Sequence, residues 1–251
     1  MYSMELIFDI NNQSDTQHIA SIIMDYLSSL YKNGQILGKE YPIALKDKMI
    51  FSYILVPDSH SLDTQYSNKY VSENYRKLSS LNITLTQRII GKEINSSNIC
   101  DCDDCKNYIL YTDYLTLESP LHCGNCFGII PLYKIPKTYD DEYYDIKCWE
   151  SNYQSCDNLQ MNCSVGAQFG IGQLSKINSN LNIEGLNICK NIINLTGKNV
   201  YYYLYHYTNK PSIKNQLDRK CPSCGGDWIL DEKLFGIFDF KCDKCLLLSN
   251  I

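Results

Sequence analysis

The stretch CPSCGGDWILDEKLFGIFDFKCDKC, residues 221–245, carries four cysteines arranged as two close pairs. A second stretch, CDDCKNYILYTDYLTLESPLHCGNC at residues 102–126, has the same arrangement. Both read C-x2-C-x17-C-x2-C, and every cysteine of the first stretch recurs 119 residues later in the second. This spacing is typical of four-cysteine zinc sites, and its repetition at identical length makes coincidence a poor explanation.

Two pairs of thiols suit zinc because a structural Zn²⁺ ion takes four ligands in tetrahedral geometry. The two residues between paired cysteines form a tight knuckle, and the neighbouring glycines and Pro222 favour such a turn. The 17 intervening residues can form a β-hairpin, and a segment of about 25 residues needs a metal to fold because it buries little apolar surface. We therefore predict two zinc ribbons with two Zn²⁺ ions, and the predicted ligands are Cys102, Cys105, Cys123 and Cys126 in the first ribbon and Cys221, Cys224, Cys242 and Cys245 in the second.

Other thiols and one imidazole lie close to these sites in the sequence. Cys100 precedes the first stretch and His122 stands beside Cys123, so either could replace a ligand. We expect both to be bystanders, because four better-spaced thiols are present. The isolated cysteines are expected to be small buried apolar residues; these are Cys148, Cys156, Cys163 and Cys189.

The charge and the cysteine content of the chain indicate which partners and which cell compartment to expect. The chain has 251 residues, 13 cysteines and a net charge of −5. The acidic residues concentrate in 97–150, where 10 acidic and 4 basic side chains give −6. Such a surface repels phosphate unless cations are grouped. We see neither a membrane-spanning run nor a secretory signal, so we predict a cytoplasmic protein whose thiols bind metal instead of forming disulfides.

Hydrophobic periodicity predicts an α+β fold. Residues 1–96 read as β-α-β-β-α-β, with a first helix capped by Ser14 or Asp15, and this order matches the ferredoxin-like motif. Helices are expected over 139–163 and 183–196, an aromatic strand over 200–208, and a connection over the glycine-rich residues 166–180. The predicted domains are a ferredoxin-like domain at 1–96, a first ribbon at 97–135, a helical segment with the aromatic strand at 136–208, and the C-terminal ribbon at 209–251.

Three segments resemble a bacterial family of unknown function whose members are described as zinc-ribbon proteins and candidate nucleic-acid binders. They are SPLHCGNCFGIIPLYKIP at 119–136, YYYLYHYT at 201–208, and the second cysteine stretch with its flanks. The resemblance implies zinc at the second ribbon and nucleic acid as a partner. The acidic composition of this chain departs from that second expectation.

We find no catalytic motif, and a four-cysteine zinc site is coordinatively closed, so we predict a non-catalytic protein that binds a macromolecule and no small-molecule substrate or membrane. For nucleic acid, the predicted surface comprises Arg219, Lys220, Trp228, Lys241 and Lys244, continued by Lys210 and Lys214. Alternatively, Trp228 packs the ribbon core and the lysines are a solvated rim. The tyrosine strand leaves the same choice between stacking bases and packing under the helix at 183–196. In the alternative function, the acidic 97–150 region binds a basic protein, as an inhibitor or immunity-type protein does.

Overall fold

The computed structural model describes residues 1–11, 15–162, 164–207 and 216–251. The chain divides into two compact units, which are described separately. Unit 1 comprises residues 1–99, 117–119 and 129–144, and unit 2 comprises residues 100–116, 120–128 and 145–251. In the described part of the chain, no helix is both long enough and apolar enough to cross a membrane.

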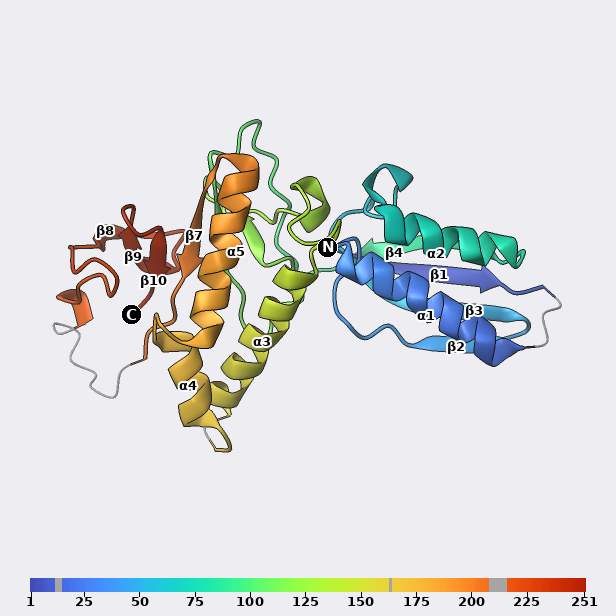
Figure 1. The fold of residues 1–251 in the computed structure, drawn as a ribbon, viewed down its shortest axis with the longest axis horizontal. Coiled ribbons are helices and arrows are strands. Elements are labelled where there is room, and N and C mark those ends of the chain that lie inside the picture. The colour runs from blue at the N-terminus through green and yellow to red at the C-terminus, as the bar shows by residue number, and fades with distance from the viewer. Residues whose placement is uncertain (12–14, 163, 208–215) are drawn as a thin grey trace. The chain divides into compact units, whose positions relative to one another are not determined.

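Unit 1 contains a four-stranded antiparallel sheet with the strand order β2-β3-β1-β4. Helices α1 and α2 lie side by side on one face of this sheet (Figure 1). The elements follow the predicted β-α-β-β-α-β order, with a short 3-10 turn before the second helix. They are β1 (Tyr2–Asp9), α1 (Thr16–Lys32), β2 (Ile43–Lys46), β3 (Met49–Val56), η1 (Thr64–Tyr66), α2 (Lys69–Ser80) and β4 (Thr84–Lys92).

Local sequence explains these elements. Side-chain alternation along β1 places Met4, Leu6 and Phe8 in the core beneath the helices. The carboxylate of Asp15 caps α1 by accepting from the amide of His18 at 3.0 Å, as one of the two predicted caps. The side chain of Asn68 caps α2, accepting from the amide of Val71 at 2.8 Å, so this helix begins at Lys69.

The other face of the four-stranded sheet, here called the open face, carries a different set of side chains. Strand register aligns Glu5 with Tyr53 and Arg88, and aligns Ile7 with Phe51. The Glu5 carboxylate lies 2.7 Å from the Arg88 guanidinium and accepts from the Tyr53 hydroxyl at 2.9 Å. Tyr53 is nevertheless 56% exposed, so its ring is accessible on this face.

Unit 2 contains a six-stranded sheet with the order β6-β5-β7-β10-β9-β8. Strands β5 and β10 run parallel to β7 on its two sides, while the outer pairs are antiparallel. The two cysteine stretches therefore contribute strands to a single sheet, with the tyrosine strand between them. The bounds are β5 (Asn107–Leu110), β6 (Leu121–Cys123), β7 (Asn199–Tyr203), β8 (Ile229–Leu234), β9 (Phe238–Cys242) and β10 (Leu247–Ser249); the helices are α3 (Tyr144–Met161), α4 (Ala167–Ser175) and α5 (Asn180–Thr196), and η2 (Leu132–Lys134) is a further 3-10 turn, in unit 1.

Helices α3 and α5 pack against one side of β7 (Figure 1). Tyr202 is fully buried there, its ring lies near that of Trp149, and its hydroxyl donates to the Asn182 side chain at 2.7 Å. Gly185 permits this packing, because a Cβ atom at that position would lie 2.3 Å from the Tyr202 ring. The tyrosine strand is thus a packed strand over residues 201–203, and it ends at Tyr203 instead of continuing to 208.

The opposite side of β7 faces an aromatic cluster that joins the two cysteine stretches. Tyr203 lies 5.0 Å from Tyr111 and 5.7 Å from Phe238, measured between ring centroids. Phe127 continues the cluster through contacts of 5.7 Å to both Tyr111 and Phe238. Residues of both stretches therefore share one aromatic core with the strand between them.

The predicted connection over 166–180 is wrong, because α4 occupies Ala167–Ser175. Its glycines are explained by packing. Gly166 begins the helix with a left-handed φ of 80°. At Gly170, a Cβ atom would lie only 2.4 Å from the carbonyl oxygen of Cys156 on α3, so glycine allows the two helices to approach closely.

Candidate metal centres and the predicted binding surface

The second cysteine stretch forms the predicted quartet. The sulfurs of Cys221, Cys224, Cys242 and Cys245 all lie within 4.8 Å of one another. The Cys224 and Cys242 sulfurs are 3.7 Å apart. A tetrahedral site with metal–sulfur bonds of about 2.3 Å requires a sulfur–sulfur separation of about 3.8 Å, so the donor set fits a Zn²⁺ ion.

Backbone turns position these sulfurs. The residue after the second cysteine of each pair is left-handed, with φ of 71° at Gly225 and 53° at Leu246. Around the first pair, the amide of Gly225 donates to the carbonyl of Cys221 at 2.8 Å, and the amide of Cys221 donates to the carbonyl of Gly226 at 2.9 Å. The backbone amide of Gly226 also lowers the pKa of Cys224 to about 7, which favours the thiolate.

In the first stretch, the structure corrects one predicted ligand. The four mutually close sulfurs belong to Cys100, Cys102, Cys123 and Cys126, again all within 4.8 Å of one another. Cys105 lies outside this quartet, and its thiol donates to the backbone carbonyl of Asn107 at 3.0 Å. Cys100, which we expected to be a bystander, takes its place.

Backbone geometry gives the reason. Phe127, after Cys126, has the left-handed φ of 61° found after the other knuckles, whereas Lys106, after Cys105, is not among the described residues with positive φ. Gly128 lets Cys100 approach, because a Cβ atom there would lie 2.9 Å from the backbone of Cys100 and 3.2 Å from the sulfur of Cys126. The Cys102–Cys105 pair therefore does not form a knuckle.

The first quartet has one thiol prepared for ionisation. Burial acts to raise the pKa of Cys123, but the amides of Asn125 and Cys126, together with the thiols of Cys105 and Cys100, bring that pKa down to about 7. By contrast, the thiol of Cys126 raises the pKa of Cys102 to about 11. A bound cation is what would allow all four sulfurs to be thiolates together.

His122 has a packing role. Its ring is buried, lies parallel to that of Phe127 with 4.4 Å between ring centroids, and places Nδ1 3.2 Å from the Phe127 carbonyl. It is outside the quartet, as expected. Of the isolated cysteines, Cys156 and Cys189 are buried and Cys148 is half-buried, whereas Cys163 lies outside the described residues.

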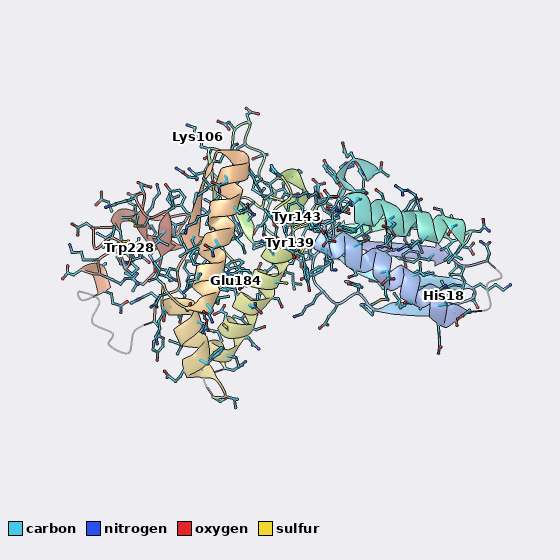
Figure 2. The ribbon with its side chains drawn as sticks, viewed as in Figure 1. His18, Lys106, Tyr139, Tyr143, Glu184 and Trp228 are labelled. Carbon is cyan, nitrogen blue, oxygen red and sulfur yellow. The ribbon has the colours of Figure 1, made fainter. Side chains whose placement is uncertain are left out.

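The predicted nucleic-acid surface of the second ribbon loses its central residues. Trp228 is 3% exposed and packs in the C-terminal ribbon, 5.1 Å from the ring of Phe240 (Figure 2). Its indole Nε1 donates to the carbonyl of Arg219 at 2.8 Å. The Arg219 guanidinium lies 4.2 Å from the Phe240 ring and donates to the Ser249 hydroxyl at 3.1 Å. Both residues therefore build the ribbon core, and Trp228 offers no free face for a base.

The lysines of that surface have acidic neighbours. Lys220 pairs with Asp227, and Lys241 lies 2.8 Å from Asp243. Lys244 is exposed at the second knuckle. Lys210 and Lys214, which continued the predicted surface, lie outside the described residues. A phosphate backbone would have to compete with these carboxylates for Lys220 and Lys241.

Comparisons with known proteins place the chain in a family. An uncharacterized protein of Haemophilus influenzae is 32% identical over 260 residues, covering 100% of this chain and 98% of its own length. The chain belongs to the family of this protein. A second uncharacterized protein of Haemophilus influenzae is 37% identical over 164 residues, covering 65% of this chain and 80% of its own length. Three families, each described as a domain of unknown function, match in succession: DUF8589 at residues 1–91, DUF2310 at 102–205 and DUF8594 at 211–251.

Proposed function

We propose that the protein is a zinc-stabilised binding protein without catalytic activity. This function rests on the two sulfur quartets, in each of which four thiols lie close enough to share one tetrahedral ion. Four thiolates fill the coordination shell, which leaves no position for a substrate or an activated water molecule. The zinc ions then stabilise the two ends of the six-stranded sheet, and the function is binding.

Metal analysis tests the first step. Tetrahedral sulfur sites suit zinc or iron. Protein purified without added metal is expected to be colourless and to contain two zinc ions per chain by plasma mass spectrometry. The Cys224→Ser variant should contain one, while Cys189→Ser, at a buried cysteine outside both quartets, should keep two. Red protein containing stoichiometric iron would contradict the zinc assignment.

We infer that residues 1–96 adopt the ferredoxin-like arrangement, supported by the β2-β3-β1-β4 order and by both helices lying on one face. The open face is then the surface we propose for single-stranded nucleic acid. Phe51 and Tyr53 project from this face on the inner strand β3, two residues apart. Four-stranded sheets with exposed aromatic rings stack bases in RNA-binding domains. Lys46 provides a cation on the same face, and Arg88 provides a second one whose contact with phosphate would compete with its ion pair to Glu5 at 2.7 Å.

Fluorescence polarisation with labelled single-stranded RNA and DNA tests this surface. Each stacked base contributes about 1–3 kcal/mol, so replacing both Phe51 and Tyr53 with alanine should weaken binding at least about tenfold. Tyr139→Ala, at an exposed tyrosine outside both sheets, is the matched control and should bind normally. Wild-type protein that leaves both probes unbound at 100 µM would overturn the nucleic-acid assignment.

A basic protein is the second candidate partner, and a different observation favours it. Asp101, Asp103 and Asp104 are exposed beside the first quartet, and Leu115 is 73% exposed. Four thiolates and one Zn²⁺ add a formal charge of −2 there, which would steer a basic partner towards this region. Affinity capture from a lysate separates the candidates. Retention of one stoichiometric basic protein after nuclease treatment, and its loss when the three aspartates become asparagines, would favour the protein partner.

A further inference from the structure

Unit 1 contains a cavity of about 340 Å³ that neither the metal centres nor the open face uses. It lies between α1, α2, the segment at residues 62–67 and strand β4. Gln87 lines it from β4, where it aligns with Leu6, whose side chain lies in the core beneath the helices. The cavity is therefore on the helix side of the sheet. Its size is within the range of about 300–1,000 Å³ that is common for small-molecule sites.

The polar lining of this cavity has no internal partners. Within the described parts of the chain, six polar side chains of the lining make no side-chain hydrogen bond or ion pair, and neither does the hydroxyl of Tyr75. The six are those of Tyr26, Thr64, Ser67, Ser72, Arg76 and Gln87. Thr64, Arg76 and Gln87 are exposed and therefore hydrated at the open side of the cavity, whereas Tyr26 is buried. A bound molecule would take the place of this water and accept hydrogen bonds from the set.

Tyr26 is the most informative of the six. Its side chain is only 4% exposed, yet its hydroxyl makes no hydrogen bond to another described residue. The hydroxyl oxygen is not fully enclosed, so part of its surface is accessible. Since Tyr26 lines the cavity, we infer that this accessible surface faces the cavity. Burial raises the pKa of Tyr26, which keeps the phenol a hydrogen-bond donor.

The charge of the lining is positive. Arg76 is its one charged member, and no acidic side chain is among the described residues that form the wall. The nearest acids in the sequence have other partners, since Glu73 lies 3.1 Å from Lys77 and Asp63 lies 3.5 Å from His60. A guanidinium without a carboxylate partner recognises carboxylate and phosphate groups through paired N–H donors.

We propose that this cavity binds a small organic anion, an aromatic molecule carrying one carboxylate or phosphate group. Arg76 receives the anionic group, and Tyr26 and the neighbouring hydroxyls donate to its oxygens. Leu62, Val71 and the ring of Tyr75 contact the apolar body. The ligand is held as a bound effector and not as a substrate, since the cavity contains no acid–base pair among its described lining residues.

Isothermal titration calorimetry and ligand-observed NMR test this site with phenyl phosphate and benzoate, which separate the two anionic groups. Phenol tests binding of the aromatic ring without the anionic group, and inorganic phosphate tests binding of the anionic group without the ring. We expect one saturable site for at least one of the first two probes. Losing one hydrogen bond to a charged group weakens binding by about 10- to 100-fold. Arg76→Gln and Tyr26→Phe should each weaken binding by such a factor.

Lys190→Gln is the matched control, because Lys190 is an exposed lysine on α5 in unit 2 and does not line the cavity. Its affinity should equal that of the wild type. The absence of saturable binding by both aromatic anions would overturn the site, as would unchanged binding in folded Arg76→Gln protein. These titrations use no nucleic acid and no protein partner, so their outcome does not depend on whether the proposed function is correct.

Discussion

Replacing Cys100 with serine should remove one of the two metal ions that we propose to be zinc, whereas replacing Cys105 should remove none. The two thiols lie in the same short segment, but only the Cys100 sulfur lies within 4.8 Å of all three sulfurs of Cys102, Cys123 and Cys126. Spacing along the sequence assigns the opposite roles. The pair of variants therefore separates the observed geometry from the spacing.

The expected loss of zinc affinity follows from the part of the zinc-binding free energy that one of the four thiolates contributes. Structural zinc sites contribute about 10–16 kcal/mol in zinc-finger peptides, so one of four ligands accounts for about 2.5–4 kcal/mol. This corresponds to a decrease in zinc affinity of about 60- to 700-fold at the first site. Cys105→Ser changes the thiol that donates to the Asn107 carbonyl and that lies beside the Cys123 thiol and the Gly124 amide, and each such neutral bond contributes about 1 kcal/mol to folding.

The assay is zinc content after equilibrium dialysis against a chelator that leaves two ions on the wild-type protein. We expect one zinc ion per chain for Cys100→Ser and two for Cys105→Ser. The double variant should match Cys100→Ser, which excludes replacement of one thiol by the other. One ion on Cys105→Ser together with two on Cys100→Ser would refute the geometric assignment.

Three further variants test packing and titration. Gly128→Ala places a Cβ atom 2.9 Å from the Cys100 backbone and should lower the zinc content of the first site. Gly172→Ala is the control, because its Cβ atom meets no other atom within 4 Å. Equal zinc content in the two variants would contradict the close approach of Gly128 to Cys100. Trp228→Ala should lower the free energy of unfolding in urea by about 3–5 kcal/mol, because the buried indole packs the ribbon core, and a loss below about 1 kcal/mol would refute that role. Burial, aided by the charge of Arg219, lowers the pKa of His206 to about 4. Below about pH 6.5 the unfolded chain therefore binds more protons than the folded protein, and the free energy of unfolding falls as the pH drops towards 4. His206→Gln should reduce this fall in urea denaturation at pH 7 and 5.5, and an unchanged fall would exclude the imidazole as its source.

Local patterns in the sequence were sufficient for the order of elements up to β4 and for the second quartet. The apolar stripe of α1 and the alternation of β1 and β3 act over a few residues, so their elements appear in the predicted order. The second quartet is equally local, because both of its pairs have a residue that adopts the left-handed turn directly after them. These features need no knowledge of distant contacts.

The first quartet could not be completed in this way. Cys100 reaches it because Asn98 accepts a hydrogen bond from Ile129 at 2.9 Å and because Gly128 leaves room, and both contacts link residues about 30 positions apart. The distance from the second cysteine of a pair to the next strand does not separate the two cases, because β5 begins two residues after Cys105 and β10 begins two residues after Cys245, yet only the latter pair forms a knuckle. Repetition of the spacing therefore decided the prediction of Cys105.

Long-range pairing also decides the alternatives that the sequence left open and explains the wrong prediction at 166–180. The roles of Trp228 and of the tyrosine strand depend on what covers them, and their partners come from β9, α3 and α5. Likewise, Gly170 indicated a loop by composition, although it marks close contact with α3. Composition alone does not distinguish a glycine required by packing from one required by a turn.

The position of β7 between two strands that run parallel to it has a consequence for synthesis of the chain. Strand β5 precedes β7, but β10 ends at Ser249, 46 residues after β7 ends at Tyr203. Pairing on the second side of β7 therefore requires the C-terminal ribbon, which is the last part of the chain to be synthesised. Until β10 pairs, β7 has an unpaired edge, and unpaired edges recruit other chains. With zinc bound as we propose, metal delivery to the last four cysteines would shorten the time for which this edge is open.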